Sequence, residues 1–86
     1  MLMPYTVYIL KSKQSDRYYI GQTNDLGLRL IRHNTGQVRS TKRDAPFDLL
    51  AKKEVASRSE AMKFEKLLKE QKGGQGFTTL LRGMEQ

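Results

Sequence analysis

The stretch Tyr5-Thr-Val-Tyr-Ile-Leu10, followed after seven polar residues by Tyr18-Tyr-Ile-Gly-Gln-Thr23, decides the fold of this chain. Both runs are rich in aromatic and β-branched residues, and turn formers lie between them, so they predict a β-hairpin. Because side chains alternate along a strand, Tyr8 faces one side, and Tyr19 shares a side with Gly21. If the register brings these sides together, the two phenols lie beside a glycine, which has no side chain and so leaves space on that face of the sheet.

The length and composition limit what kind of protein this is. A chain of 86 residues predicts a single domain, residues 1–86, with one modest core. It has no cysteine, which excludes a disulfide framework, cysteine zinc sites and thiol nucleophiles, and the single His33 excludes a histidine-rich metal site. No apolar run is long enough for a membrane span, and Met1–Met3 does not open a signal peptide. We therefore expect a cytoplasmic protein with no membrane partner.

The charge balance bears on the partner. Sixteen Lys and Arg residues against nine Asp and Glu give a net charge of +7. An excess of this size favours polyanions such as nucleic acids. Charge alone leaves a basic protein with no such partner as an equal alternative.

A helix is predicted after the hairpin. Thr23–Asp25 offers three N-cap candidates, and the helix should run over Asp25–Asn34, with Gly36 ending it in a left-handed conformation. Its apolar stripe consists of Leu26, Leu30 and Ile31. Arg29 and His33 lie four residues apart and so project from one face of this helix.

The polar segment Gln37–Asp44 carries Arg39, Lys42 and Arg43. One interpretation is a solvated, mobile connection, which we favour for the free protein. The other is a loop that contacts phosphates.

A third strand should begin at Pro46, where a missing backbone donor is tolerated. Alternation places Phe47, Leu49, Ala51 and Val55 on one face, with Lys53 interrupting the series. This pattern is typical of a half-exposed strand at the edge of a sheet.

Two further helices complete the chain. Ser57 and Glu60 form a capping box for a helix that runs to Lys72, with Ala61, Phe64 and Leu68 as its apolar stripe. Glu65 borders that stripe, and an ion pair with Lys69 one turn later is its plainest role. Gly73–Gly76 then predicts a flexible joint, Phe77–Arg82 a short helix, and Gly83–Gln86 a frayed end.

The predicted order is β-β-α-β-α-α. It indicates an α/β (α+β) domain with a small three-stranded, mainly antiparallel sheet flanked by helices.

Two triplets in the hairpin add a family resemblance. Thr6-Val7-Tyr8 and Tyr19-Ile20-Gly21 resemble the paired signature of the GIY-YIG nuclease family, with Thr and Val replacing Gly and Ile in the first. The family carries an arginine and, one turn later, a histidine or tyrosine on the next helix, and Arg29 and His33 stand there. It carries a glutamate on a later helix, where Glu65 stands. The short length is similar to the small stand-alone branch, which has no separate DNA-binding domain.

This resemblance implies a metal-dependent endonuclease that hydrolyses phosphodiester bonds. Tyr8 would be the general base that takes a proton from the attacking water. Arg29 would bind the scissile phosphate, and Glu65 would hold Mg²⁺ or Mn²⁺. Tyr19 and His33 would orient the water or accept the relayed proton.

The basic residues and the end of the second triplet predict the substrate contacts. We expect nucleic acid at Gly21, Gln22, Arg32, Arg39, Lys42 and Arg43. Some relatives have a lysine where this chain has Gln22. The glutamine lacks the positive charge of that lysine, so this chain has one phosphate contact fewer. DNA is favoured over RNA, and the oligomeric state stays open. The main alternative is a nucleic-acid-binding module of the same fold with little or no activity, and a weaker one is a protein-interaction adaptor that uses the third strand.

Overall fold

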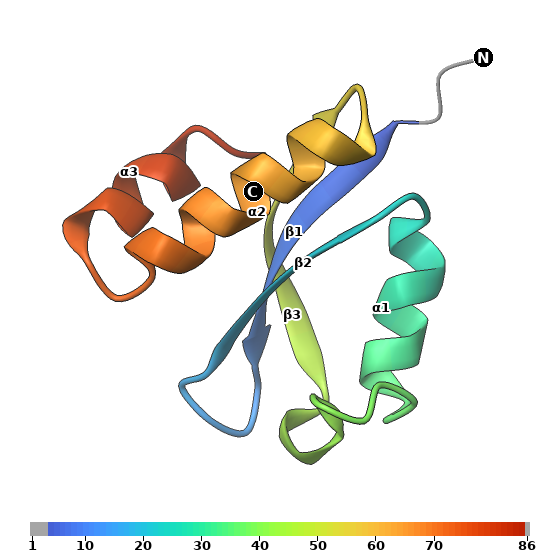
Figure 1. Cartoon of the computed structure of the whole chain (residues 1–86). Coiled ribbons are helices and arrows are strands. Elements are labelled where there is room, and N and C mark those ends of the chain that lie inside the picture. The colour runs from blue at the N-terminus through green and yellow to red at the C-terminus, as the bar shows by residue number, and fades with distance from the viewer. Residues whose placement is uncertain (1–3, 86) are drawn as a thin grey trace.

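The computed structural model describes residues 4–85 and has a three-stranded sheet with helices on both faces (Figure 1). The elements are β1 (Tyr5–Ser12), β2 (Tyr18–Thr23), α1 (Leu26–Asn34), a 3-10 turn (Lys42–Asp44), β3 (Phe47–Val55), α2 (Arg58–Gln71) and α3 (Gln75–Arg82). The strand order is β2-β1-β3 and both pairings are antiparallel, which confirms the predicted α+β fold. Expectations about Met1–Met3 and Gln86 concern residues outside this range. Within it, no helix is long and apolar enough to cross a bilayer.

The register of the hairpin brings the two tyrosine faces together. Tyr8 pairs with Gly21, and Leu10 pairs with Tyr19, so all four residues share one face of the sheet. β1 is the central strand and is buried on both faces, since Val7 and Ile9 on the opposite face are fully covered. The predicted arrangement of the hairpin is therefore confirmed.

Two hydrophobic cores lie on opposite faces of the sheet. The core under α2 and α3 contains Val7, Ile9, Ala51, Ala61, Leu68, Phe77 and Met84. The smaller core under α1 contains Tyr8, Leu10 and Phe47, with Tyr19, Leu26 and Leu30 packed against it. The sheet thus separates a layer that carries α1 from a layer that carries α2 and α3 (Figure 1).

A register shift in β3 changes the predicted face pattern. Leu10 pairs with Leu49 while Ile9 pairs with Ala51, so Leu50 is an extra residue in β3. The bulge puts Phe47 in the α1 core and Ala51 in the α2 core, and the prediction that both lie on one face is wrong. The edge position of β3 is confirmed.

The helix caps follow the sequence closely. The Asp25 side chain accepts a hydrogen bond from the Leu28 N–H at 3.1 Å, and Gly36 has a positive φ of 76°. Ser57 Oγ accepts from the Glu60 N–H at 3.2 Å. Ile31, predicted to join the apolar stripe of α1, is 58% exposed because it points about 100° away from Leu30 around the helix.

Two segments are more ordered than predicted. Met84 is only 6% exposed, and the backbone of Glu85 pairs with Lys52 on the outer edge of β3, so a frayed end is wrong for these residues. In the polar segment before β3, Thr41 and Asp44 are 3% and 7% exposed. A purely solvated loop is therefore also wrong.

Candidate active site

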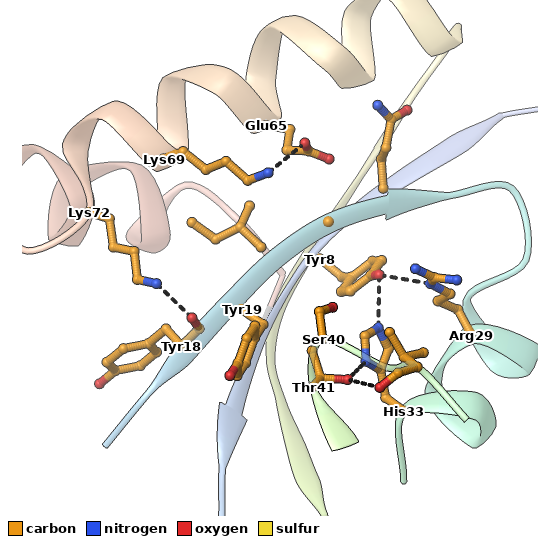
Figure 2. Close-up of a pocket in the computed structure, with 14 residues that line it drawn as sticks. Tyr8, Tyr18, Tyr19, Arg29, His33, Ser40, Thr41, Glu65, Lys69 and Lys72 are labelled. Carbon is orange, nitrogen blue, oxygen red and sulfur yellow. Dashed lines mark hydrogen bonds and ion pairs between the residues drawn. The ribbon is translucent and has the colours of Figure 1, made fainter. Parts of the chain in front are cut away.

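A cavity of about 540 Å³ opens where α1, β2, α2 and the segment before β3 meet (Figure 2). Its lining includes all five residues predicted to be catalytic: Tyr8, Tyr19, Arg29, His33 and Glu65. The other lining residues are Tyr18, Ile20, Gly21, Gln22, Val38, Ser40, Thr41, Lys69 and Lys72. The site thus combines side chains from both layers around the edge strand β2.

A directed chain of hydrogen bonds forms one wall of the cavity. Arg29 Nε donates to Tyr8 Oη at 3.3 Å, and Tyr8 Oη lies 3.2 Å from His33 Nε2. His33 Nδ1 lies 2.8 Å from Thr41 Oγ1, which itself donates to the Val38 carbonyl at 3.4 Å. With its hydroxyl proton directed at the Val38 carbonyl, the Thr41 oxygen can accept from Nδ1–H. In that tautomer His33 Nε2 is an acceptor for the Tyr8 hydroxyl.

The environment of His33 supports this assignment. The side chain is 3% exposed, and its ring packs edge-on against Tyr8 and Phe47. Burial, and then the positive charge of Arg29, lower the pKa of His33 below its ordinary value. The imidazole is consequently neutral near pH 7 and can accept a proton from Tyr8.

The second phenol has a different environment. Tyr19 Oη donates to Asp44 Oδ2 at 2.5 Å, and this hydrogen bond, followed by burial, raises the pKa of Tyr19. The same hydrogen bond lowers the pKa of Asp44. Tyr19 therefore keeps its proton and holds the 3-10 turn, whereas Tyr8 faces a neutral base.

Gly21 is required by the close approach of Tyr8. A Cβ atom on Gly21 would lie 2.5 Å from Tyr8 Oη and 2.7 Å from its Cζ. Both distances are far below van der Waals contact, so any side chain here would displace the phenol.

The opposite wall comes from α2. The carboxylate of Glu65 borders the cavity and accepts from Lys69 Nζ at 3.0 Å. Lys72 Nζ donates to the Tyr18 carbonyl of β2 at 2.7 Å. One carboxylate and two ammonium groups therefore project toward β2 from α2 and its C-cap residue (Figure 2).

The residues present fit a hard divalent cation. Residues 4–85 contain no cluster of three or more His, Cys, Asp or Glu side chains that could hold a metal. The cavity offers the Glu65 carboxylate and also Gln22 Oε1, which is buried and has no hydrogen-bond partner. Mg²⁺ prefers oxygen ligands and keeps several waters, so few protein oxygens suffice. Glu65 would hold the ion, with the Gln22 oxygen available to it or to one of its waters.

The predicted substrate contacts divide into two groups. Gly21 and Gln22 line the cavity, whereas Arg32, Arg39, Lys42 and Arg43 do not. Sequence reasoning missed Thr41, Asp44 and Lys72. Lys72 lies seven residues after Glu65, two helical turns on, and this spacing could have identified it.

Comparisons with known proteins identify the family of this chain. Residues 4–77 match the family model described as the GIY-YIG catalytic domain. A UPF0213 protein of Streptococcus pneumoniae serotype 4 is 39% identical over 67 residues, which cover 77% of this chain and 67% of that protein. A UPF0213 protein of Oceanobacillus iheyensis is 38% identical over 65 residues, 74% of each chain. The solution NMR structure of a UPF0213 protein from Bacillus halodurans is 31% identical, with a TM-score of 0.48 and coverage of 90% of this chain and 94% of the other. The chain belongs to the GIY-YIG catalytic domain family.

Proposed function

We propose that this protein is a divalent-metal-dependent endonuclease that hydrolyses phosphodiester bonds of nucleic acid in the cytoplasm. DNA is the favoured substrate over RNA. One observation carries the proposal. The hydrogen-bond chain from Arg29 through Tyr8 to His33 ends at a neutral imidazole and shares one cavity with the Glu65 carboxylate. A proton acceptor, a phosphate-binding cation and an acidic ligand are the groups that this hydrolysis requires.

In the proposed reaction, Tyr8 acts as the general base. Its oxygen takes a proton from the attacking water while its own proton passes to Nε2 of His33. Thr41 Oγ1, 2.8 Å from Nδ1, would accept from that nitrogen and so direct Nε2 at the phenol. As the new P–O bond forms, the bond from phosphorus to the leaving sugar oxygen breaks, and that oxygen takes a proton from solvent.

Arg29 and Glu65 handle the charge. The Nε of Arg29 is used on Tyr8, and its two terminal amino groups remain for two oxygens of the scissile phosphate. A divalent cation on Glu65 would stabilise the extra negative charge of the transition state and acidify bound water. Gly21 allows the Tyr8 phenol to lie against the backbone of β2 in the position that this reaction needs.

The direct test is cleavage of flapped, branched and single-stranded DNA, and of RNA of the same sequences, with Mg²⁺ or Mn²⁺. Tyr8→Phe should lower the rate by about 10²–10⁴-fold, and Glu65→Gln should do so at least as strongly. Tyr5→Phe and Glu70→Gln are matched controls, because neither residue lines the cavity, and they should leave the rate unchanged. Cleavage that survives both site substitutions undiminished would assign the activity to a contaminant.

The competing proposal is a binding module with little turnover. The ion pair of Glu65 with Lys69 favours it, since the carboxylate already has a cationic partner. Affinity for a DNA duplex should then fall with salt, by a slope of about 0.9 for each neutralised phosphate, without cleavage. Measured turnover that depends on Tyr8 decides between the two.

A further inference from the structure

The helix α2 and its C-cap residue Lys72 present three charged groups to the cavity. Glu65 is followed by Lys69 one turn later and by Lys72 a further turn on, and all three line the cavity. The side chain of Lys69 is 55% exposed, whereas that of Glu65 is 21% exposed. Lys69 is therefore the more solvent-exposed partner of this pair, and Glu65 is the more enclosed one.

The two lysines differ in how their charges are compensated. Lys69 is paired with Glu65 at 3.0 Å. Lys72 donates to the backbone carbonyl of Tyr18, and the ion pairs found within residues 4–85 include no carboxylate for it. An anchored ammonium group without a counter-ion, beside a second one that can be released, is a surface suited to a phosphate.

We propose that Lys69 has two successive partners: Glu65 in the free protein, and a substrate phosphate next to the scissile one when the cation is bound. The inference rests on the proposed function, because it assigns the cation to Glu65. A divalent charge on that carboxylate repels the ammonium group of Lys69, and exposed ion pairs at this spacing are weak enough to exchange.

The released Lys69 then lies one turn from Lys72 and shares the flanking phosphate with it. Figure 2 shows Lys69 reaching from α2 and Lys72 from the end of that helix, while Arg29 reaches the cavity from α1. The nucleic-acid strand would therefore cross β2, with its scissile phosphate at Arg29 and the flanking phosphate at the lysines. Cation and substrate each strengthen the binding of the other.

The first test measures Mn²⁺ binding to the protein without nucleic acid. Lys69→Met should tighten Mn²⁺ binding by about two- to fivefold, because the competing ammonium is gone. Lys66→Met is the matched control: it removes the same charge from the same helix at a residue outside the cavity, and should change nothing. Glu65→Gln should abolish binding. Equal or weaker Mn²⁺ affinity in Lys69→Met would overturn the proposal, as would wild-type protein that binds no Mn²⁺ at this carboxylate.

The second test measures oligonucleotide affinity in a Tyr8→Phe background, which prevents turnover. Mn²⁺ should raise the affinity and steepen its salt dependence by about 0.7 for single-stranded DNA, the value for one further phosphate contact. Adding Lys69→Met should remove this gain, and Lys66→Met should keep it. An undiminished gain in Lys69→Met would overturn the proposal.

The two proposals fail separately. Opposite effects of Lys69→Met on Mn²⁺ and on oligonucleotide binding support the role of Lys69 even if the protein cleaves nothing. Cleavage that depends on Tyr8 supports the nuclease even if Lys69→Met has neither effect.

Discussion

Replacing Gly21 with alanine tests whether the position of the Tyr8 hydroxyl determines catalysis. The added Cβ would lie 2.7 Å from Tyr8 Cζ, whereas carbon atoms in contact lie about 3.5–4.0 Å apart. The phenol must therefore move by roughly 1 Å. Tyr8 is 3% exposed and pairs directly with Gly21 in the neighbouring strand, so the sheet cannot easily absorb the change.

The expected consequences are large for catalysis and moderate for stability. The bonds of Tyr8 to His33 and Arg29, at 3.2 and 3.3 Å, are already long, and a shift of this size breaks at least one of them. A misplacement of about 1 Å can lower a rate by about 10²-fold. Overpacking at a buried site costs about 1–3 kcal/mol of unfolding free energy.

The matched control is Gly27→Ala, the same substitution in the exposed first turn of α1. Its Cβ would meet only Asp25 Oδ1, at an ordinary 3.8 Å. Alanine favours helix over glycine, so the free energy of unfolding should rise by up to about 1 kcal/mol while cleavage stays unchanged. Urea unfolding and initial cleavage rates, both measured on folded protein, give the two numbers. Wild-type rate and stability in Gly21→Ala would refute the reasoning.

Three further predictions address the support of the site. Thr41→Val removes the acceptor for His33 Nδ1, so the cleavage rate should fall about tenfold and the pH profile of cleavage should shift. Thr41→Ser should keep the wild-type rate and the wild-type pH profile. An unshifted pH profile in the valine variant would contradict the assigned tautomer. Because burial and Arg29 lower the pKa of His33, the unfolded chain binds the proton more readily, and the free energy of unfolding should fall as the pH drops below about 6.5. Urea titrations between about pH 7.5 and 5.5 check this, and His33→Gln should flatten the dependence. Met84→Ala should lower the free energy of unfolding in urea by about 2–4 kcal/mol, because Met84 is buried. The same substitution at the exposed Met62 should lower it by less than about 0.5 kcal/mol. Equal losses in the two variants would show that Met84 is not part of the core.

The parts of the site that lie on regular elements were predictable. Alternation along β2 placed Tyr19 with Gly21, and the four-residue spacing in α1 placed Arg29 with His33. Each prediction needs only the period of one element. Bringing Glu65 to the same cavity from another layer depended on the family resemblance, because periodicity says nothing about how separate elements meet.

The parts that escaped prediction depend on contacts between distant segments. Thr41 and Asp44 lie in a segment without periodicity, and their partners His33 and Tyr19 are 8 and 25 residues away. The bulge at Leu50 leaves no mark in the sequence, since either face of β3 can bury a leucine there. A four-residue tail gave no reason to expect that Met84 would be buried.

The separation of the two cores by the sheet has a mechanical consequence. The proposed general base Tyr8 and its partner His33 lie in the α1 layer, whereas Glu65 and the lysines lie in the α2 layer, and the sheet lies between the two cores. Local opening of α2 would release the carboxylate and leave the Tyr8–His33 contact intact. Amide hydrogen exchange should therefore show two protection levels, one for each helix layer. A substitution that weakens the α2 layer should displace Glu65 and the lysines and leave Tyr8 and His33 in place.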